Sequence, residues 1–121
     1  MRILIVEDDR GQQMVYRLWF EDHSPDICDS VERARKLLEE NRYDAVIIDL
    51  YLKEDETGLR LIEEMARKRE RPRIVIVSAY TDRLREMFPV ELEGMCWISK
   101  EEATKERLME ELGLELSLIH I

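Results

Sequence analysis

The sequence predicts an α/β fold in which a parallel β-sheet is covered by helices on both faces. Three short runs of apolar, mostly β-branched residues recur along the chain, at 3–6, 45–48 and 74–77. Each run is continuous rather than alternating, which is typical of strands that are buried on both faces of a sheet. Segments with helical periodicity separate the runs. Such alternation favours parallel strands joined by crossover helices.

Two weaker segments complete the expected set of strands. Residues 95–98 follow Gly94, and residues 26–28 follow Pro25. Repeated strand–helix units with right-handed crossovers predict a doubly wound, three-layer α/β/α sandwich. We expect a five-stranded sheet with the flavodoxin-like strand order 2-1-3-4-5.

The helices are predicted from the spacing of their apolar residues. They are expected at 10–22, 31–41, 58–70, 81–88 and 101–112. In the first of them, the apolar residues at 14, 15, 18 and 19 are expected to form the buried face. Asp29 is expected to cap the second helix and Gly113 to end the last.

Composition limits the classes of function. The chain has 121 residues and a net charge of −9, which argues against a nucleic-acid-binding surface. Cys28 and Cys96 lie in apolar stretches and are expected to be reduced core residues. No apolar run approaches the length of a signal sequence or a membrane span, so the cytoplasm is the expected location. Residues 1–113 are expected to form one domain.

The tail at residues 114–121 alternates between apolar and polar residues over part of its length. Such a pattern is compatible with an added edge strand, with a contact in a homodimer, or with the stub of a longer chain. The sequence leaves these alternatives open.

Polar side chains follow four of the expected strands. Glu7 and Asp8 come after the first strand, Asp49 after the third, Ser78 after the fourth and Lys100 after the fifth. Because ligands of open parallel sheets bind beyond the carboxyl ends of the strands, these residues are expected to converge. Each acidic residue alone could equally be a loop or helix-capping residue.

The expected cluster has a definite chemistry. Two ionised carboxylates about 4 Å apart repel each other by about 4 kcal/mol at an effective dielectric constant of about 20, so the cluster calls for a cation. Oxygen ligands with room for water favour Mg²⁺, and Mn²⁺ would also bind. Lys100 and Ser78 would supply a positive charge and a donor for a phosphoryl group. Asp49 could then act as a carboxylate nucleophile.

With these residues in place, the sequence resembles the receiver domains of two-component response regulators. The resemblance is carried by ILIVEDD at 3–9, YDAVIIDLYL at 43–52, IVIVSAY at 74–80 and WISK at 97–100. The four segments and their spacing extend the likeness over residues 2–113. It implies that Asp49 accepts a phosphoryl group from a histidine kinase, a phosphotransfer protein or a small phosphodonor.

The resemblance also implies roles for the other residues. Asp8 would bind Mg²⁺ directly and Glu7 through water, while Asp49 and the backbone carbonyl of Tyr51 would be further ligands. Ser78 matches the switch hydroxyl and Lys100 the lysine that pairs with phosphate. Trp97 matches the aromatic switch position, although a half-buried core aromatic explains it equally well.

Residues near the site are expected to govern access to it and to differ from the family in places. Tyr51 and Tyr80 match the positions beside the path of the hydrolytic water, and the small Ala79 keeps the entrance open. Glu101 follows Lys100 where the family usually has proline, so a trans peptide bond is expected there. The loop that begins at residue 50 lacks the usual proline and is one residue longer before Gly58.

Phosphorylation is expected to move segment 81–99 and so to change a surface for a downstream protein partner or output domain. Such a chain would be a signalling switch rather than an enzyme with an external substrate. One alternative is a pseudo-receiver, an interaction module that is never phosphorylated. Another is a Mg²⁺-dependent phosphohydrolase, but its second catalytic acid would have to stand where the chain has Tyr51.

Overall fold

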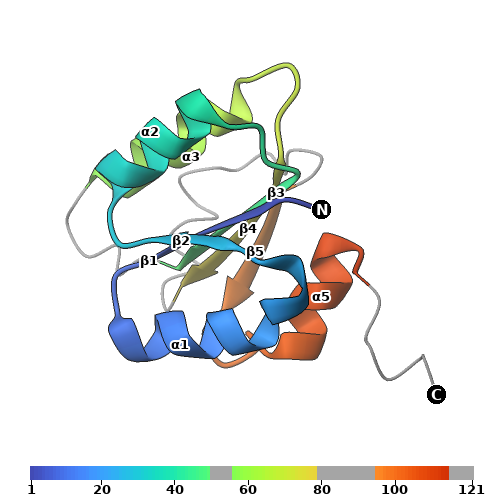
Figure 1. Cartoon of the computed structure of the whole chain (residues 1–121). Coiled ribbons are helices and arrows are strands. Elements are labelled where there is room, and N and C mark those ends of the chain that lie inside the picture. The colour runs from blue at the N-terminus through green and yellow to red at the C-terminus, as the bar shows by residue number, and fades with distance from the viewer. Residues whose placement is uncertain (50–55, 79–94, 115–121) are drawn as a thin grey trace.

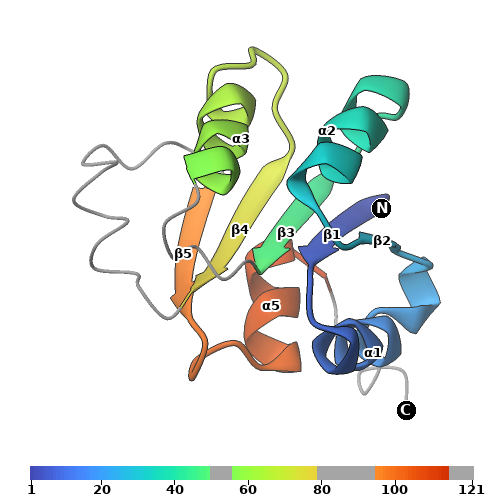
Figure 2. The same cartoon turned by 90° about the vertical axis from the view of Figure 1, so that its left-hand side faces the viewer.

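The computed structural model describes residues 1–49, 56–78 and 95–114, and for residues 56–59 it describes the backbone alone. Five strands form one sheet with the order β2-β1-β3-β4-β5, and every neighbouring pair is parallel. The strands are β1 (Ile3–Glu7), β2 (Asp26–Cys28), β3 (Ala45–Asp49), β4 (Arg73–Ser78) and β5 (Met95–Ser99). Figure 2 shows this order across the sheet. The predicted fold class and strand order are confirmed.

Helices cover both faces of the sheet. They are α1 (Arg10–Trp19), α2 (Val31–Glu40), α3 (Glu56–Ala66) and α5 (Lys105–Leu112), with a short 3₁₀ turn, η1, at Glu21–His23. Helices α2 and α3 lie on one face, and α1 and α5 lie on the other (Figure 1). The helix predicted at 81–88 falls outside the described residues. The three-layer sandwich is therefore present.

Two apolar cores fill the space on either side of the sheet, because successive side chains of a strand point to opposite faces. In β1, for example, Leu4 and Val6 belong to the core under α2 and α3, whereas Ile3 and Ile5 belong to the core under α1 and α5. All five residues of β1 and of β3 are buried. This burial explains why both strands have continuous apolar sequences.

The predicted buried face of α1 is wrong at Met14 and Leu18, whereas Trp19 packs against the core as predicted. Met14 and Leu18 are 66% and 67% exposed, whereas Tyr16 and Phe20 are completely buried. The expectation gave weight to the purely apolar side chains and ignored a tyrosine. A tyrosine can be buried when its hydroxyl finds a hydrogen-bond partner, and here it does. The helix also ends at Trp19, before the predicted limit.

Side-chain caps fix where α2 and α5 begin. Ser30, rather than Asp29, caps α2 and accepts a hydrogen bond from the backbone N–H of Arg33 at 3.2 Å. Thr104 caps α5 in the same way, so this helix begins four residues later than predicted, after a turn at 100–102. Gly113 ends α5 with a φ of 72°, as predicted.

The boundaries of α3 differ from the prediction as well, because the helix spans 56–66 rather than 58–70. Its buried side chains are Leu61, Ile62 and Met65, which pack into the core that it shares with α2. The side chain of Leu59 is outside the described part.

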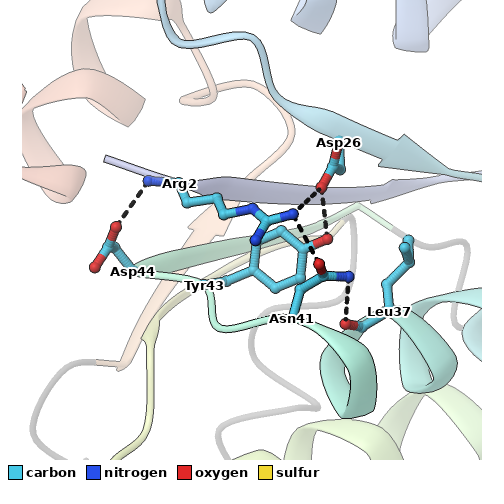
Figure 3. Close-up of polar contacts among 6 residues, drawn as sticks. All are labelled: Arg2, Asp26, Leu37, Asn41, Tyr43 and Asp44. Carbon is cyan, nitrogen blue, oxygen red and sulfur yellow. Dashed lines mark hydrogen bonds and ion pairs between the residues drawn. The ribbon is translucent and has the colours of Figure 1, made fainter.

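A polar network closes the edge of the sheet at which the strands begin (Figure 3). The backbone N–H of Arg2 donates to Asp44 at 2.7 Å, and its guanidinium donates to Asn41 at 2.8 Å and lies 3.7 Å from Asp26. Tyr43 donates its hydroxyl to Asp26 at 2.6 Å, and Arg2 lies over its ring. These contacts join the start of β1 to β2 and to the segment before β3.

The remaining predictions on chain organisation concern the cysteines, the membrane and the tail. Cys28 and Cys96 are free thiols, and burial raises the pKa of each to about 11. None of the helices in the described ranges is long and apolar enough to cross a membrane. Leu114 packs against the core under α1 and α5, whereas residues 115–121 lie outside the described part.

Candidate functional site

The register of the sheet brings the predicted site residues to one edge. Glu7 at the end of β1 is paired with Asp49 at the end of β3. Asp49 is in turn paired with Val77, so Ser78 lies one residue further along β4. Ser78 is paired with Ser99, and Lys100 follows at once. Residues from four strands therefore meet at the carboxyl edge, as the sequence predicts.

Asp49 is at the centre of this edge and is only 2% exposed. Its Oδ2 atom accepts a hydrogen bond of 2.6 Å from the hydroxyl of Tyr16, and its Oδ1 atom lies 3.2 Å from Nζ of Lys100. Oδ1 nevertheless has no aligned hydrogen bond among the described residues. Partial burial lowers the pKa of Lys100, but the charge of Asp49 outweighs it and the pKa is raised overall. Lys100 is therefore a cation at neutral pH.

Glu7 is the second buried carboxyl group, 1% exposed. Burial, and then the proximity of Asp49, raises the pKa of Glu7 to about 9. Its Oε1 atom accepts a hydrogen bond from the backbone N–H of Asp9 at 2.9 Å, whereas Oε2 has no partner in the described part of the chain. Without a cation, Glu7 thus keeps its proton at neutral pH, which avoids two buried negative charges side by side.

The other predicted residues occupy distinct positions. Asp8 is exposed beyond the end of β1, and its carboxyl group helps to raise the pKa of Glu7. Asp9 is exposed and caps α1 through the N–H of Gln12 at 2.8 Å, as expected for a residue at the start of this helix. Ser78 is buried at the site edge. Trp97 is 8% exposed and packs in the core under α2 and α3.

Three predicted residues, Tyr51, Ala79 and Tyr80, lie outside the described residues, as does the loop that was expected to be one residue longer. The peptide bond between Lys100 and Glu101 is trans, as predicted in the absence of proline.

The sequence analysis missed Tyr16, which contacts Asp49 directly. The prediction placed the apolar residues at 14 and 18 on the buried face of α1, whereas Tyr16 is on the face that is buried. One signal was present: Tyr16 and Phe20 are spaced four residues apart and so share a helical face. A buried tyrosine on that face needs a hydrogen-bond partner, and the nearby strand ends are the place to look for one.

The donor set of this edge fits Mg²⁺. Buried oxygen atoms of Glu7 and Asp49 lack hydrogen-bond partners among the described residues, and a divalent cation would satisfy both. The described residues contain no ready-made group of three ligating side chains. Mg²⁺ does not require one, because it commonly binds through one or two carboxylates and keeps several waters.

A cavity of about 240 Å³ opens beside the acidic pair. Asp49 and Lys100 of the site edge line it, together with Trp19 of α1 and Ala103. The cavity therefore borders the predicted acceptor.

The fold is that of a known protein family. The profile of the response regulator receiver domain matches residues 3–112. This chain belongs to the response regulator receiver domain family. Receiver domains are components of two-component signalling. No curated protein matches the sequence of this receiver domain.

Solved structures share the fold of this receiver domain. A sensor protein from Polaromonas sp. JS666 is 26% identical, with a TM-score of 0.72, and the match covers 93% of this chain and 92% of that one. Response regulator protein TrrA from Thermotoga maritima, in complex with Mg²⁺ and BeF, is 21% identical with a TM-score of 0.72, over 93% and 96% of the two chains. A CheY-like receiver domain from Methylobacillus flagellatus is 22% identical with a TM-score of 0.69, over 93% and 98%.

Proposed function

We propose that this receiver domain is a Mg²⁺-dependent phosphorylation switch whose acceptor is Asp49. One observation carries the proposal: the buried carboxylate of Asp49 lies in register with Glu7 and 3.2 Å from the ammonium group of Lys100. Lys100 would supply one positive charge to a phosphoryl group, and the Glu7–Asp49 pair would supply oxygen ligands for Mg²⁺. The receiver unit of the proposal spans residues 1–113, with residues 114–121 as a tail.

Each described residue of the edge has a part in the transfer. A carboxylate oxygen of Asp49 forms a bond to phosphorus, and the bond from phosphorus to the donor's leaving group breaks, so that this group departs with the electron pair. Lys100 balances the negative charge of the phosphoryl oxygens, and Ser78 donates a hydrogen bond to one of them. Glu7, Asp8 and Asp49, with the carbonyl of Tyr51, would hold the metal. When bound, Mg²⁺ neutralises charge on the phosphoryl oxygens.

The regulatory consequences follow from the added charge. A phosphoryl group on Asp49 draws Ser78 and Lys100 toward it, and segment 81–99, including Trp97, presents a changed surface to a downstream partner or output domain. The phosphodonor is a histidine kinase, a phosphotransfer protein or a small acyl phosphate. Ala79, Tyr51 and Tyr80 control access of the donor and of water to the phosphoryl group.

A direct test is intact-mass analysis of the chain after incubation with acetyl phosphate. With Mg²⁺ present, we expect the mass of one phosphoryl group to be added, because acetyl phosphate presents a good leaving group to Asp49. With EDTA in place of Mg²⁺, no addition is expected, since the phosphoryl oxygens then lack the divalent cation that neutralises their charge during transfer. An unchanged mass in both samples would favour the pseudo-receiver, the alternative that leaves Asp49 unmodified.

We expect the fluorescence of Trp97 to report the switch. Adding beryllofluoride and Mg²⁺ places a phosphoryl mimic on Asp49, and Trp97, two residues from Ser99 on β5, is expected to change environment. The fluorescence change should persist when Trp19, the other tryptophan, is replaced by phenylalanine. It should disappear in Trp97→Phe. A Trp19→Phe protein whose fluorescence does not change would show that Trp97 is a core residue without a switch role.

A further inference from the structure

The hydroxyl of Tyr16 lies at the site edge and contacts the predicted acceptor. It donates to Oδ2 of Asp49 at 2.6 Å across 33 residues of sequence. Tyr16 is completely buried among the side chains of the core under α1 and α5. Its ring also packs edge-on against that of Trp19, with 5.7 Å between centroids. Packing therefore holds the hydroxyl against one particular carboxylate.

The Tyr16 hydroxyl is the donor in this hydrogen bond. Burial, reinforced by the negative charge of Asp49, raises the pKa of Tyr16 far above the ordinary value for tyrosine. Gln12 lies close enough to interact with the same hydroxyl, but its amide carries no charge. Asp49, which accepts this hydrogen bond, is therefore the partner whose charge can change.

Phosphorylation changes the acceptor. An ionised carboxylate accepts a charge-assisted hydrogen bond, which is about twice as strong as one to a neutral oxygen. In an aspartyl phosphate, one oxygen of Asp49 becomes a carbonyl oxygen and the other becomes the bridging oxygen to phosphorus. Whichever of them faces Tyr16, the charge that strengthens the hydrogen bond is lost. The Tyr16 hydroxyl therefore stabilises the unmodified carboxylate more than the phosphorylated one.

We propose that Tyr16 shortens the lifetime of the phosphorylated state by favouring the return of Asp49 to its ionised form. The inference rests on the proposed phosphorylation of Asp49. In hydrolysis, a water oxygen bonds to phosphorus, the bond between phosphorus and the Asp49 oxygen breaks, and its electron pair stays on the carboxylate. Both protons of the water leave with the phosphate, as H₂PO₄⁻. The Tyr16 hydrogen bond strengthens as this charge develops on the carboxylate, so the transition state is stabilised.

The test compares Tyr16→Phe with Tyr43→Phe. Tyr43 donates to Asp26 at the same distance of 2.6 Å but at the opposite edge of the sheet, so it is a matched control. Each protein is phosphorylated with acetyl phosphate and Mg²⁺, freed of donor, and followed by intact mass. Tyr16→Phe should retain its phosphoryl group about five times longer than wild type, from the lost difference in hydrogen-bond strength. Tyr43→Phe should decay like wild type.

A second variant separates the hydroxyl from its role in packing. Fluorotyrosine introduced at position 16 alone keeps the ring in the core and makes the hydroxyl a stronger donor. We expect its phosphorylated form to decay faster than wild type, the opposite of Tyr16→Phe. A merely structural role for the ring would not reverse the sign.

The outcomes are distinct. Equal decay of wild type and Tyr16→Phe would overturn the inference while leaving the proposed function intact. Faster decay in Tyr16→Phe would also overturn it and would mean that the hydroxyl binds the phosphoryl group instead. Wild type that takes up no phosphoryl group would defeat the proposed function itself. Thermal unfolding of each variant identifies any that is not folded, in which case fluorotyrosine decides.

Discussion

Replacing Asp49 with asparagine is expected to abolish the uptake of a phosphoryl group from acetyl phosphate. An amide oxygen of similar shape can still accept the Tyr16 hydrogen bond, but it lacks the negative charge of a nucleophile and cannot form a stable acyl phosphate. The loss should therefore be complete at any donor concentration. Intact mass measures it, and peptide mapping of the wild-type product should place the modification on Asp49.

Asp26→Asn is the matched control for this prediction. Asp26 also accepts a tyrosine hydroxyl at 2.6 Å, from Tyr43, but it lies at the start of β2, away from the site edge. Its replacement changes the network in Figure 3 and should leave phosphorylation at the wild-type level. Uptake that persists in Asp49→Asn would show that another carboxylate is the acceptor. Asp8 would be the first residue to examine.

Glu7→Gln is expected to stabilise the metal-free protein at neutral pH by about 3 kcal/mol. The pKa of Glu7 is raised from 4.5 to about 9 in the folded protein, so folding at pH 7 must be accompanied by proton uptake. The folded state binds the extra proton between these two pH values, and wild-type stability therefore falls as pH rises from about 4.5 to about 9. Glutamine at position 7 removes this contribution to the pH dependence of the free energy of unfolding.

Urea unfolding at several pH values in EDTA tests this prediction. The difference in free energy of unfolding between Glu7→Gln and wild type should be small near pH 4 and grow toward pH 8. Adding Mg²⁺ should reduce or reverse the difference, because a bound cation stabilises the wild-type carboxylate pair more than a pair with one amide. A difference that stays constant with pH would show that Glu7 is ionised in the metal-free protein.

The sequence predicted the sheet and the convergence of its strand ends well. Runs such as Ile3–Val6 are buried on both faces, and this environment leaves a strong pattern in the sequence. Once the strands are parallel and their order is known, the register pairs Glu7 with Asp49 without reference to any loop. The carboxylates, Ser78 and Lys100 could thus be assigned to one edge from their positions alone.

The predictions that were wrong concern positions at which neighbouring residues favour different local structures about equally. Asp29 and Ser30 are both good caps, and only the backbone geometry selects Ser30 for α2. The rotation of α1 about its axis depends on how Tyr16 and Phe20 fit the core, which apolar spacing alone does not determine. The Tyr16–Asp49 hydrogen bond was therefore beyond the reach of periodicity, since it requires the position of a tertiary partner.

Glu7 and Asp49 are paired on adjacent strands. The spacing between neighbouring strands, about 4.8 Å, therefore determines how far apart the backbones of the acidic pair lie. Insertions and substitutions in the connecting segments can alter which molecules approach without changing that spacing. A chimera that carries the connecting segments of another protein on this sheet should therefore keep the electrostatic character of its carboxylates while acquiring a different choice of partner.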